Sequence, residues 1–171
     1  MKYFASVLAL ALGTTAAFAD SYTVTVTNNM TEELFAPIVV TDAANDGALF
    51  TMGYVTDAAE AQILTGDPKT VVAAIGMDMV TVAHGEDGPP GVLLAPGKSI
   101  TFTVDTNATA LRVLAMVAPT MVPDNYVTAL VDLNAGGITV DLPRFDIGHD
   151  EGTKTNSPVA ASAGTISFVK N

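Results

Sequence analysis

The chain of 171 residues contains no cysteine and no tryptophan, and it has only 7 Lys and Arg against 18 Asp and Glu. Without cysteine it can form no disulfide framework and no thiolate metal site. The shortage of basic residues argues against nucleic acid and anionic lipid as partners, because phosphate binding needs clustered cations. An acidic surface suits solubility, cation binding or a basic partner.

A bilayer-spanning segment is also missing, because the longest apolar run is shorter than the roughly 20 residues that a membrane helix needs. That run lies at the start of the chain, in MKYFASVLALALGTTAAFAD. It follows Lys2, extends over residues 3–12, and precedes small residues at Ala17 and Ala19. This order of charge, apolar core and small residues is typical of a secretory signal peptide.

We therefore predict that residues 1–19 are a signal peptide and that residues 20–171 form a single domain. Loss of Lys2 with the signal changes the net charge from −11 to −12. Export of a protein without disulfides is common in bacteria. The predicted location is therefore the bacterial periplasm or the extracellular space, with no integral membrane segment in the mature chain.

Short alternating segments dominate the rest of the sequence. SYTVTVTN (21–28) places apolar residues on one face and Ser and Thr on the other, which predicts a β-strand. Pro37, inside one of the predicted strands, suggests an edge position or a bulge. Turn residues separate the segments, and many short strands favour an all-β, antiparallel two-sheet sandwich. The other predicted strands are 34–41, 79–84, 99–105, 110–118, 126–133, 137–143 and 164–170.

One Ala-rich region, residues 56–77, breaks this pattern. Thr56 or Asp57 can cap a helix, and Glu60 stands at the capping-box spacing from Asp57. Gly66 is expected to end this helix, and the following Asp-Pro pair can begin another. We expect one or two short helices here, in a connection between strands.

Catalytic signatures are absent: the sequence has no G-x-S-x-G elbow, P-loop, HExxH or dinucleotide fingerprint. Its many carboxylates keep a hydrolase as an alternative, but glycosidase clefts usually carry stacking aromatics, and only 6% of this chain is aromatic. The two histidines, His84 and His149, lie far apart in sequence, which argues against a transition-metal site. We do not expect an enzyme.

The segment RFDIGHDEGT (144–153) concentrates carboxylates and glycines. Asp146 and Asp150 can point inward together on a turning loop, and glycines permit the positive φ angles of a tight wrap. Ca²⁺ prefers six to eight oxygen ligands, and backbone carbonyls near Gly148 are candidates for some of them. An EF-hand is excluded, because the ligand at the third position of its loop would fall on Gly148 and its invariant glycine on Glu151.

Further ligands must therefore come from elsewhere in the chain, and Asp124 in the turn Pro123-Asp124-Asn125 is the best candidate. If strands 110–118 and 126–133 are antiparallel neighbours, this turn lies at the end of the sheet that strand 137–143 also reaches. Three carboxylates gathered there repel one another unless a cation neutralises them. An ordinary acidic surface turn remains the alternative, as it does for the second acidic loop, GEDGPPG (85–91).

These segments resemble the spondin N-terminal domain, which is found in F-spondin-like matrix proteins and in small exported bacterial proteins. The resemblance is carried by LRVLAMVAPTMVPDNYVTALVDL (111–133) and ITVDLPRFDIGHDEGTKTNS (138–157). It extends to YTVTVTNNMTEELFAPIVV, LFTMGYV and LLAPGKSITFTV, and so covers nearly all of the mature chain. It implies a sandwich related to C2 domains.

The resemblance also implies calcium binding through Asp124, Asp146 and Asp150. This sequence departs from the animal members at Asn125, which precedes the aromatic Tyr126, and at Phe145, where they have tryptophan. It also lacks their cysteines. The implied function is an exported calcium-binding module that binds or adheres to a protein, cell-surface or matrix partner. The alternative is an exported structural protein with no specific ion site.

Overall fold

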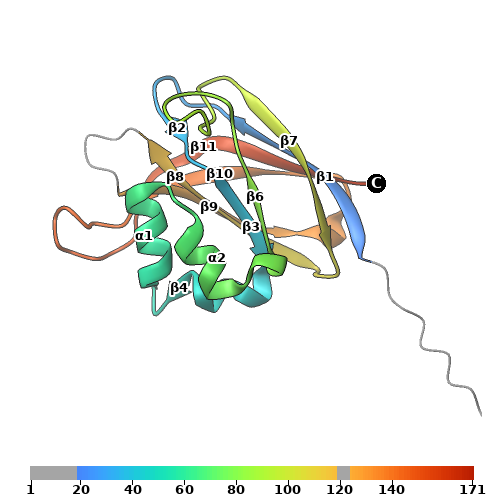
Figure 1. Cartoon of the computed structure of the whole chain (residues 1–171), viewed down its shortest axis with the longest axis horizontal. Coiled ribbons are helices and arrows are strands. Elements are labelled where there is room, and N and C mark those ends of the chain that lie inside the picture. Colours follow the sequence, from blue (N-terminus) through green and yellow to red (C-terminus); the bar gives the residue numbers. More distant parts are fainter. Residues whose placement is uncertain (1–18, 119–123) are drawn as a thin grey trace, which may run out of the picture.

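The computed structural model describes residues 19–118 and 124–171 (Figure 1). The predicted signal peptide, except Ala19, and Pro123 of the predicted turn lie outside these residues. No helix in the described part of the chain is long and apolar enough to cross a membrane. The strands are β1 Asp20–Asn28, β2 Leu34–Phe35, β3 Ile38–Asp42, β4 Phe50–Thr51, β5 Tyr54–Val55, β6 Val80–Ala83, β7 Ser99–Thr106, β8 Ala110–Ala118, β9 Asn125–Asp132, β10 Ile138–Asp146 and β11 Ser157–Lys170.

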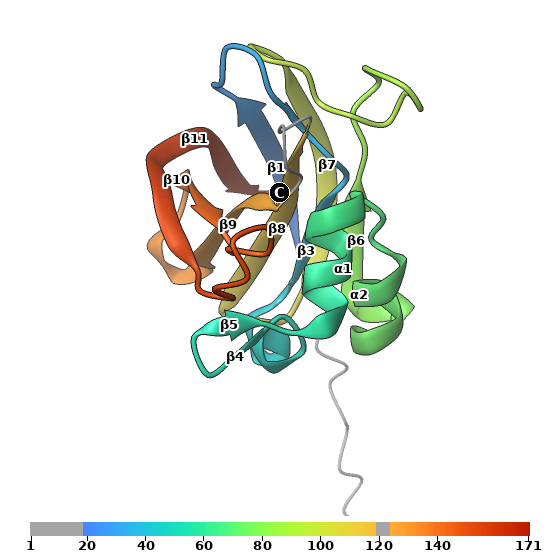
Figure 2. The same cartoon turned by 90° about the vertical axis from the view of Figure 1, so that its left-hand side faces the viewer.

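The main sheet has the strand order β6-β3-β8-β9-β10-β11-β1-β7, with β2 added beside β8. Every pairing in it is antiparallel. The sheet curves until it is nearly closed, and β4 and β5 form a small second sheet (Figures 1 and 2). The prediction of an antiparallel all-β fold is thus confirmed.

The alternation in β1 explains how the sheet forms its core. Val24 and Val26 are fully buried, whereas the intervening threonines are half-buried. On the exposed face Thr25 and Thr27 form side-chain hydrogen bonds to Thr101 and Ser99 of β7. A period of two therefore places one side of each strand in the core and the other toward water.

Three strand predictions need correction. Strand β11 begins at Ser157 and not at residue 164. The predicted strand 34–41 is divided at Pro37 into β2 and β3. Since β3 pairs with both β6 and β8, it is not an edge strand. Proline has no N–H to donate to a ladder, so it separates two strands here instead of lying within one. Strand β10 extends beyond the predicted 137–143 as far as Asp146, which places this residue on the sheet.

The Ala-rich region forms α1 Asp57–Thr65 and α2 Lys69–Ile75, as the sequence predicted. Thr56 caps α1, because its hydroxyl accepts the N–H of Ala59 at 3.3 Å. Gly66 ends α1 with a φ of 73°. The capping box from Asp57 to Glu60 is wrong, because Thr56 is the cap and Glu60 makes other contacts. Short 3₁₀ helices occur at Ala43–Ala48, Met77–Met79 and Leu133–Ala135.

A second hydrophobic cluster lies where the helices pack on the sheet. Ala59, Ile63 and Val71 of the helical region meet Leu114 of β8 and Tyr126 of β9. Ile147, directly after β10, belongs to the same cluster and is fully buried. This packing holds the start of β9 and the end of β10 in a fixed relation to the helices.

Candidate metal centre

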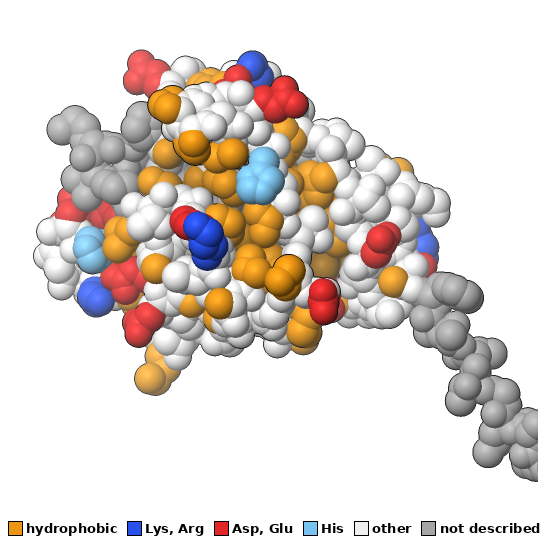
Figure 3. Space-filling view, viewed as in Figure 1, with side chains coloured by type: hydrophobic (Ala, Val, Ile, Leu, Met, Phe, Trp, Pro, Cys, Tyr) orange, Lys and Arg blue, Asp and Glu red, His pale blue; other side chains and the backbone are white. Residues whose placement is uncertain are grey.

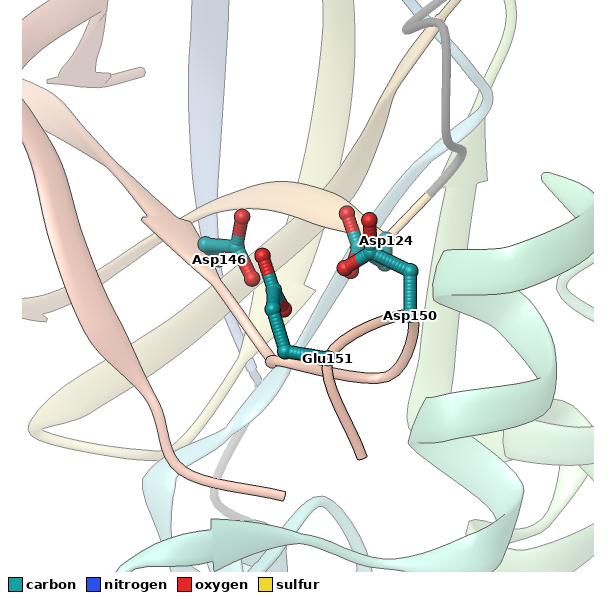
Figure 4. Close-up of side chains that lie close together, drawn as sticks. All are labelled: Asp124, Asp146, Asp150 and Glu151. Atoms are coloured by element: carbon teal, nitrogen blue, oxygen red, sulfur yellow. The ribbon is translucent and has the colours of Figure 1, made fainter. Parts of the chain in front are cut away.

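Four carboxylates converge where β9 begins and β10 ends. Asp124, Asp146, Asp150 and Glu151 each offer an oxygen, and these oxygens all lie within 4.8 Å of one another. Figure 4 shows the four side chains directed toward a common space. The structure thus brings together the three aspartates singled out in the sequence and adds Glu151, which was not predicted.

Strand pairing accounts for the meeting of Asp124 and Asp146, which lie 22 positions apart in sequence. Strands β8 and β9 are antiparallel neighbours, and Asp146 of β10 pairs with Asn125 of β9. Just beyond this pair, the N–H of Ile147 donates to the carbonyl of Asp124 at 3.1 Å. The carboxylates of Asp124 and Asp146 are therefore positioned by the sheet.

The loop that follows β10 supplies Asp150 and Glu151. Gly148 has a φ of 63°, and a Cβ at this position would lie 2.1 Å from the hydroxyl oxygen of Thr153. Its carbonyl accepts the N–H groups of Thr153 and Lys154 at 3.0 and 3.1 Å. The Gly148 carbonyl is thus hydrogen-bonded within the loop, and the expectation that backbone carbonyls near Gly148 supply further ligands stays a prediction.

Backbone N–H groups and one amide side chain hold the inner carboxylates. The N–H of Gly148 donates to Asp146 at 2.6 Å, and that of His149 donates to Asp124 at 3.2 Å. Asn125 Nδ2 donates to both aspartates, at 3.0 Å to Asp124 and 3.1 Å to Asp146. These contacts fix the spacing of the two carboxylates before any ion arrives.

Arg144 acts on this arrangement through Asn125. Its Nε donates to Asn125 Oδ1 at 2.6 Å, and its guanidinium also pairs with Glu33 at 2.8 Å. The first contact orients the Asn125 amide so that its Nδ2 faces the aspartates. In the sequence Asn125 stood out only as a departure from the animal family members. Nothing in its spacing indicated that it would bridge two ligands.

No Lys or Arg of the described residues forms an ion pair with the four carboxylates. Hydrogen bonding between the Asp150 and Glu151 carboxyl groups lowers the pKa of Asp150 and raises that of Glu151. The charges of Asp150 and Asp146 also raise the pKa of Glu151. Protonation of Glu151 at acidic pH would relieve the repulsion in the ion-free site, and a bound cation would oppose this protonation.

The outer side of the loop is attached to helix α1. His149 Nδ1 lies 3.0 Å from Glu60, which also pairs with Lys154 at 3.4 Å. Burial alone would raise the pKa of Glu60, but hydrogen bonds from His149, Lys154 and Tyr54 outweigh it and lower the pKa. Burial, with the nearby Glu60 carboxylate, raises the pKa of Tyr54 to about 12. The His149 side chain is itself exposed.

The donor set consists only of oxygens, which suits a hard cation such as Ca²⁺ or Mg²⁺. Asp124 is buried at 2% exposure, Asp146 is half-buried, and Asp150 and Glu151 are exposed. The cluster therefore has a rigid inner side on the sheet and an outer side open to solvent. This cluster of acidic residues could hold a metal ion, and its geometry alone does not identify which one.

No family model matches this chain, and a search of curated proteins finds no match. The resemblance to the spondin N-terminal domain therefore stays a prediction that depends on the sequence segments quoted above.

Proposed function

We propose that the protein is an exported calcium-binding module, in which the ion fixes the loops at one end of the domain. The main supporting observation is the convergence of Asp124, Asp146, Asp150 and Glu151 around one space, where no Lys or Arg of residues 19–118 or 124–171 pairs with them. Like charges at this separation favour the uptake of a cation. The all-oxygen donor set favours calcium over zinc or copper.

We further infer that the nearly closed sheet corresponds to a C2-like two-sheet sandwich of the spondin type. Support comes from the quoted sequence segments and from the pairing of β8, β9 and β10, which places the turn aspartate beside the aspartate pair. On this proposal the chain acts as a binding or adhesion module for a protein, cell-surface or matrix partner in the periplasm or outside the cell. The role is one of binding, not catalysis.

The proposed ion is mainly structural. It would join the fixed carboxylates of Asp124 and Asp146 to the exposed loop residues Asp150 and Glu151. An ion that binds only the folded state stabilises it by about 2.7 kcal/mol at a hundredfold excess over Kd. Extracellular calcium modules commonly have Kd values of roughly 10⁻⁴–10⁻³ M. Millimolar calcium is therefore expected to give part of this stabilisation.

A thermal melt of the purified protein, stripped of metal with a chelator, tests the proposal. CaCl₂ should raise the melting temperature more than NaCl at the same ionic strength. The NaCl control separates coordination from general screening of the acidic surface. Equal shifts from the two salts would show that the cluster is only an acidic turn, as in the alternative of an exported structural protein without an ion site.

The less favoured alternative, a hydrolase that uses two of these carboxylates, is tested separately. A screen of glycoside and ester substrates with the purified protein should give no turnover above that of the Asp146→Asn variant. Turnover that requires Asp146 would replace the binding proposal with an enzymatic one.

A further inference from the structure

Strand β7 has one free edge. It pairs with β1 along its whole length, in an unbroken register from Asp20 opposite Thr106 to Thr27 opposite Ser99. On its other side, no strand in residues 19–118 or 124–171 pairs with it, so β7 is one end of the main sheet. The other end of the sheet is β6, which pairs with β3 and with no other strand among the described residues. No ladder of these residues therefore joins β7 to β6, although the two strands lie close together at the Thr106 end of β7.

The direction of the free backbone groups follows from one hydrogen bond. The N–H of Asn28 donates to the carbonyl of Lys98 at 3.0 Å, so the Lys98 backbone faces β1. Backbone direction alternates along a strand, so Ile100, Phe102 and Val104 also face β1. The residues whose N–H and C=O groups point to the free edge are therefore Ser99, Thr101, Thr103 and Asp105.

This edge lacks the usual obstacles to pairing. Strand β7 contains no proline, its pairing with β1 shows no bulge, and Asp105 is its sole charged residue. Proteins commonly protect edge strands with proline, bulges, lysines or very short length. A strand of 8 residues without these features can accept another strand.

The side chains around the edge define what could pair with it. Ile100 and Phe102 are half-buried and pack against the main core, so they leave apolar surface for a neighbouring strand. At one end of β7, a cavity of about 260 Å³ is lined by Asp42, Asp78 and Asp105, and no Lys or Arg of the described part of the chain lines it.

The other end of β7 borders a second cavity, of about 360 Å³, lined by Glu86, Asp87 and Lys98. Lys98 pairs with Asp87, which leaves Glu86 without a neutralising partner among the lining residues. Figure 3 shows a few separate acidic side chains on this mostly uncharged and apolar face. Both ends of the free edge therefore favour positive charge on a partner.

We propose that the free edge of β7 binds an extended cationic peptide segment by strand addition. The backbone of the segment pairs with Ser99, Thr101 and Thr103, since β6 lies beside the Asp105 end of the edge. Its apolar side chains lie beside Ile100 and Phe102, and its Lys or Arg residues lie near the acidic ends. A second copy of this chain is a poorer partner, because each copy has a net charge of −11. This surface is separate from the candidate metal centre, and the proposal does not depend on calcium.

The test uses a labelled peptide of alternating Lys and Val, of the same length as β7, and measures binding to the purified protein by fluorescence anisotropy. Thr103→Pro removes an N–H from the free edge without removing a hydrogen bond to β1, so the fold should be retained. Thr103→Ala is the matched control, because it loses the same side chain but keeps the N–H. We expect Thr103→Pro to bind about tenfold more weakly than Thr103→Ala, since it loses hydrogen bonds and blocks pairing.

A second comparison does not depend on how the protein variant folds. A Lys/Val peptide methylated on the alternate backbone nitrogens that face β7 should bind about tenfold more weakly than the unmethylated peptide. A Glu/Val peptide should not bind, and NaCl should weaken the Lys/Val complex. Equal binding by the methylated and unmethylated peptides, equal binding by Glu/Val, or no binding at all would overturn the proposal. The proposal would also be overturned if the protein formed a dimer that prevented peptide binding and if Thr103→Pro dissociated this dimer. A second copy of the chain would then occupy the edge.

Discussion

Two acidic, glycine-containing loops of this chain have similar compositions and different surroundings. In GEDGPPG (85–91), Asp87 pairs with Lys98 and accepts the N–H of Ala95 at 3.1 Å. The hydrogen bond from Lys98 lowers the pKa of Asp87. In RFDIGHDEGT (144–153), the carboxylates meet other carboxylates, and Glu151 has a raised pKa. Composition alone does not distinguish a neutralised acidic loop from one that can bind a cation; the side chains brought in by strand pairing do.

The largest expected effect is the loss of calcium response on removal of an inner carboxylate. Asp124→Asn and Asp146→Asn should each abolish most of the calcium-specific rise in melting temperature, which corresponds to about 2.7 kcal/mol at a hundredfold excess over Kd. The fold should remain, because the single Asn oxygen keeps one of the two hydrogen bonds that each carboxylate accepts, and one negative charge fewer reduces repulsion. Asp87→Asn, in the other loop, is the control and should keep the full calcium response. A full response in Asp146→Asn would remove this residue from the site.

The next effect concerns Gly148. Gly148→Ala should lower the free energy of unfolding by about 1–3 kcal/mol and weaken calcium binding, because alanine is strained at this φ and its Cβ would meet Thr153. Gly152→Ala is the matched control in the same loop: its φ is 68°, but a Cβ there meets nothing within 4 Å. Chemical denaturation and calcium titration of both variants measure the difference. If the two variants behave alike, only the backbone angle matters and the close approach to Thr153 does not.

A smaller effect is expected from pH. The pKa of Glu151 is raised in the ion-free protein, so this residue takes up a proton at a higher pH than an ordinary glutamate. Calcium must then compete with this proton as the pH falls. Calcium affinity should therefore decrease on acidification, beginning above the normal Glu range. Glu151→Gln should bind calcium more weakly at neutral pH and show a flatter pH dependence. Titration calorimetry at several pH values checks this, and an unchanged slope in Glu151→Gln would assign the proton to another group.

The smallest effect tests the neutralised loop. Lys98→Gln removes the partner of Asp87 but leaves the N–H of Ala95 in place. We expect a slight decrease in melting temperature and no new calcium response, because exposed ion pairs contribute little and Asp87 has no converging carboxylates. A calcium-specific rise that appears only in Lys98→Gln would show that the ion pair, and not the number of carboxylates, distinguishes the two loops.

Local patterns in the sequence predicted most of the longer strands, both α-helices and part of the site. Alternation in β1 predicted its buried and exposed faces, and the Ala-rich stretch with Thr56 and Gly66 predicted the helices. Asp124, Asp146 and Asp150 could be selected because turn residues and glycines lie beside them. These features are local: they depend on the period of a strand, on capping and on turn chemistry, which are visible within a few residues.

The tertiary structure decided the contacts between distant segments. Pairing of β9 with β10 placed Asn125 between two carboxylates and Arg144 behind it, and the folding of the loop after β10 turned Glu151 toward them. It also left one edge of β7 free, although the residues of β7 resemble those of β1. None of these follows from spacing along the chain, because each depends on strand register and on which strands end the sheet, and both are set by packing of the whole core.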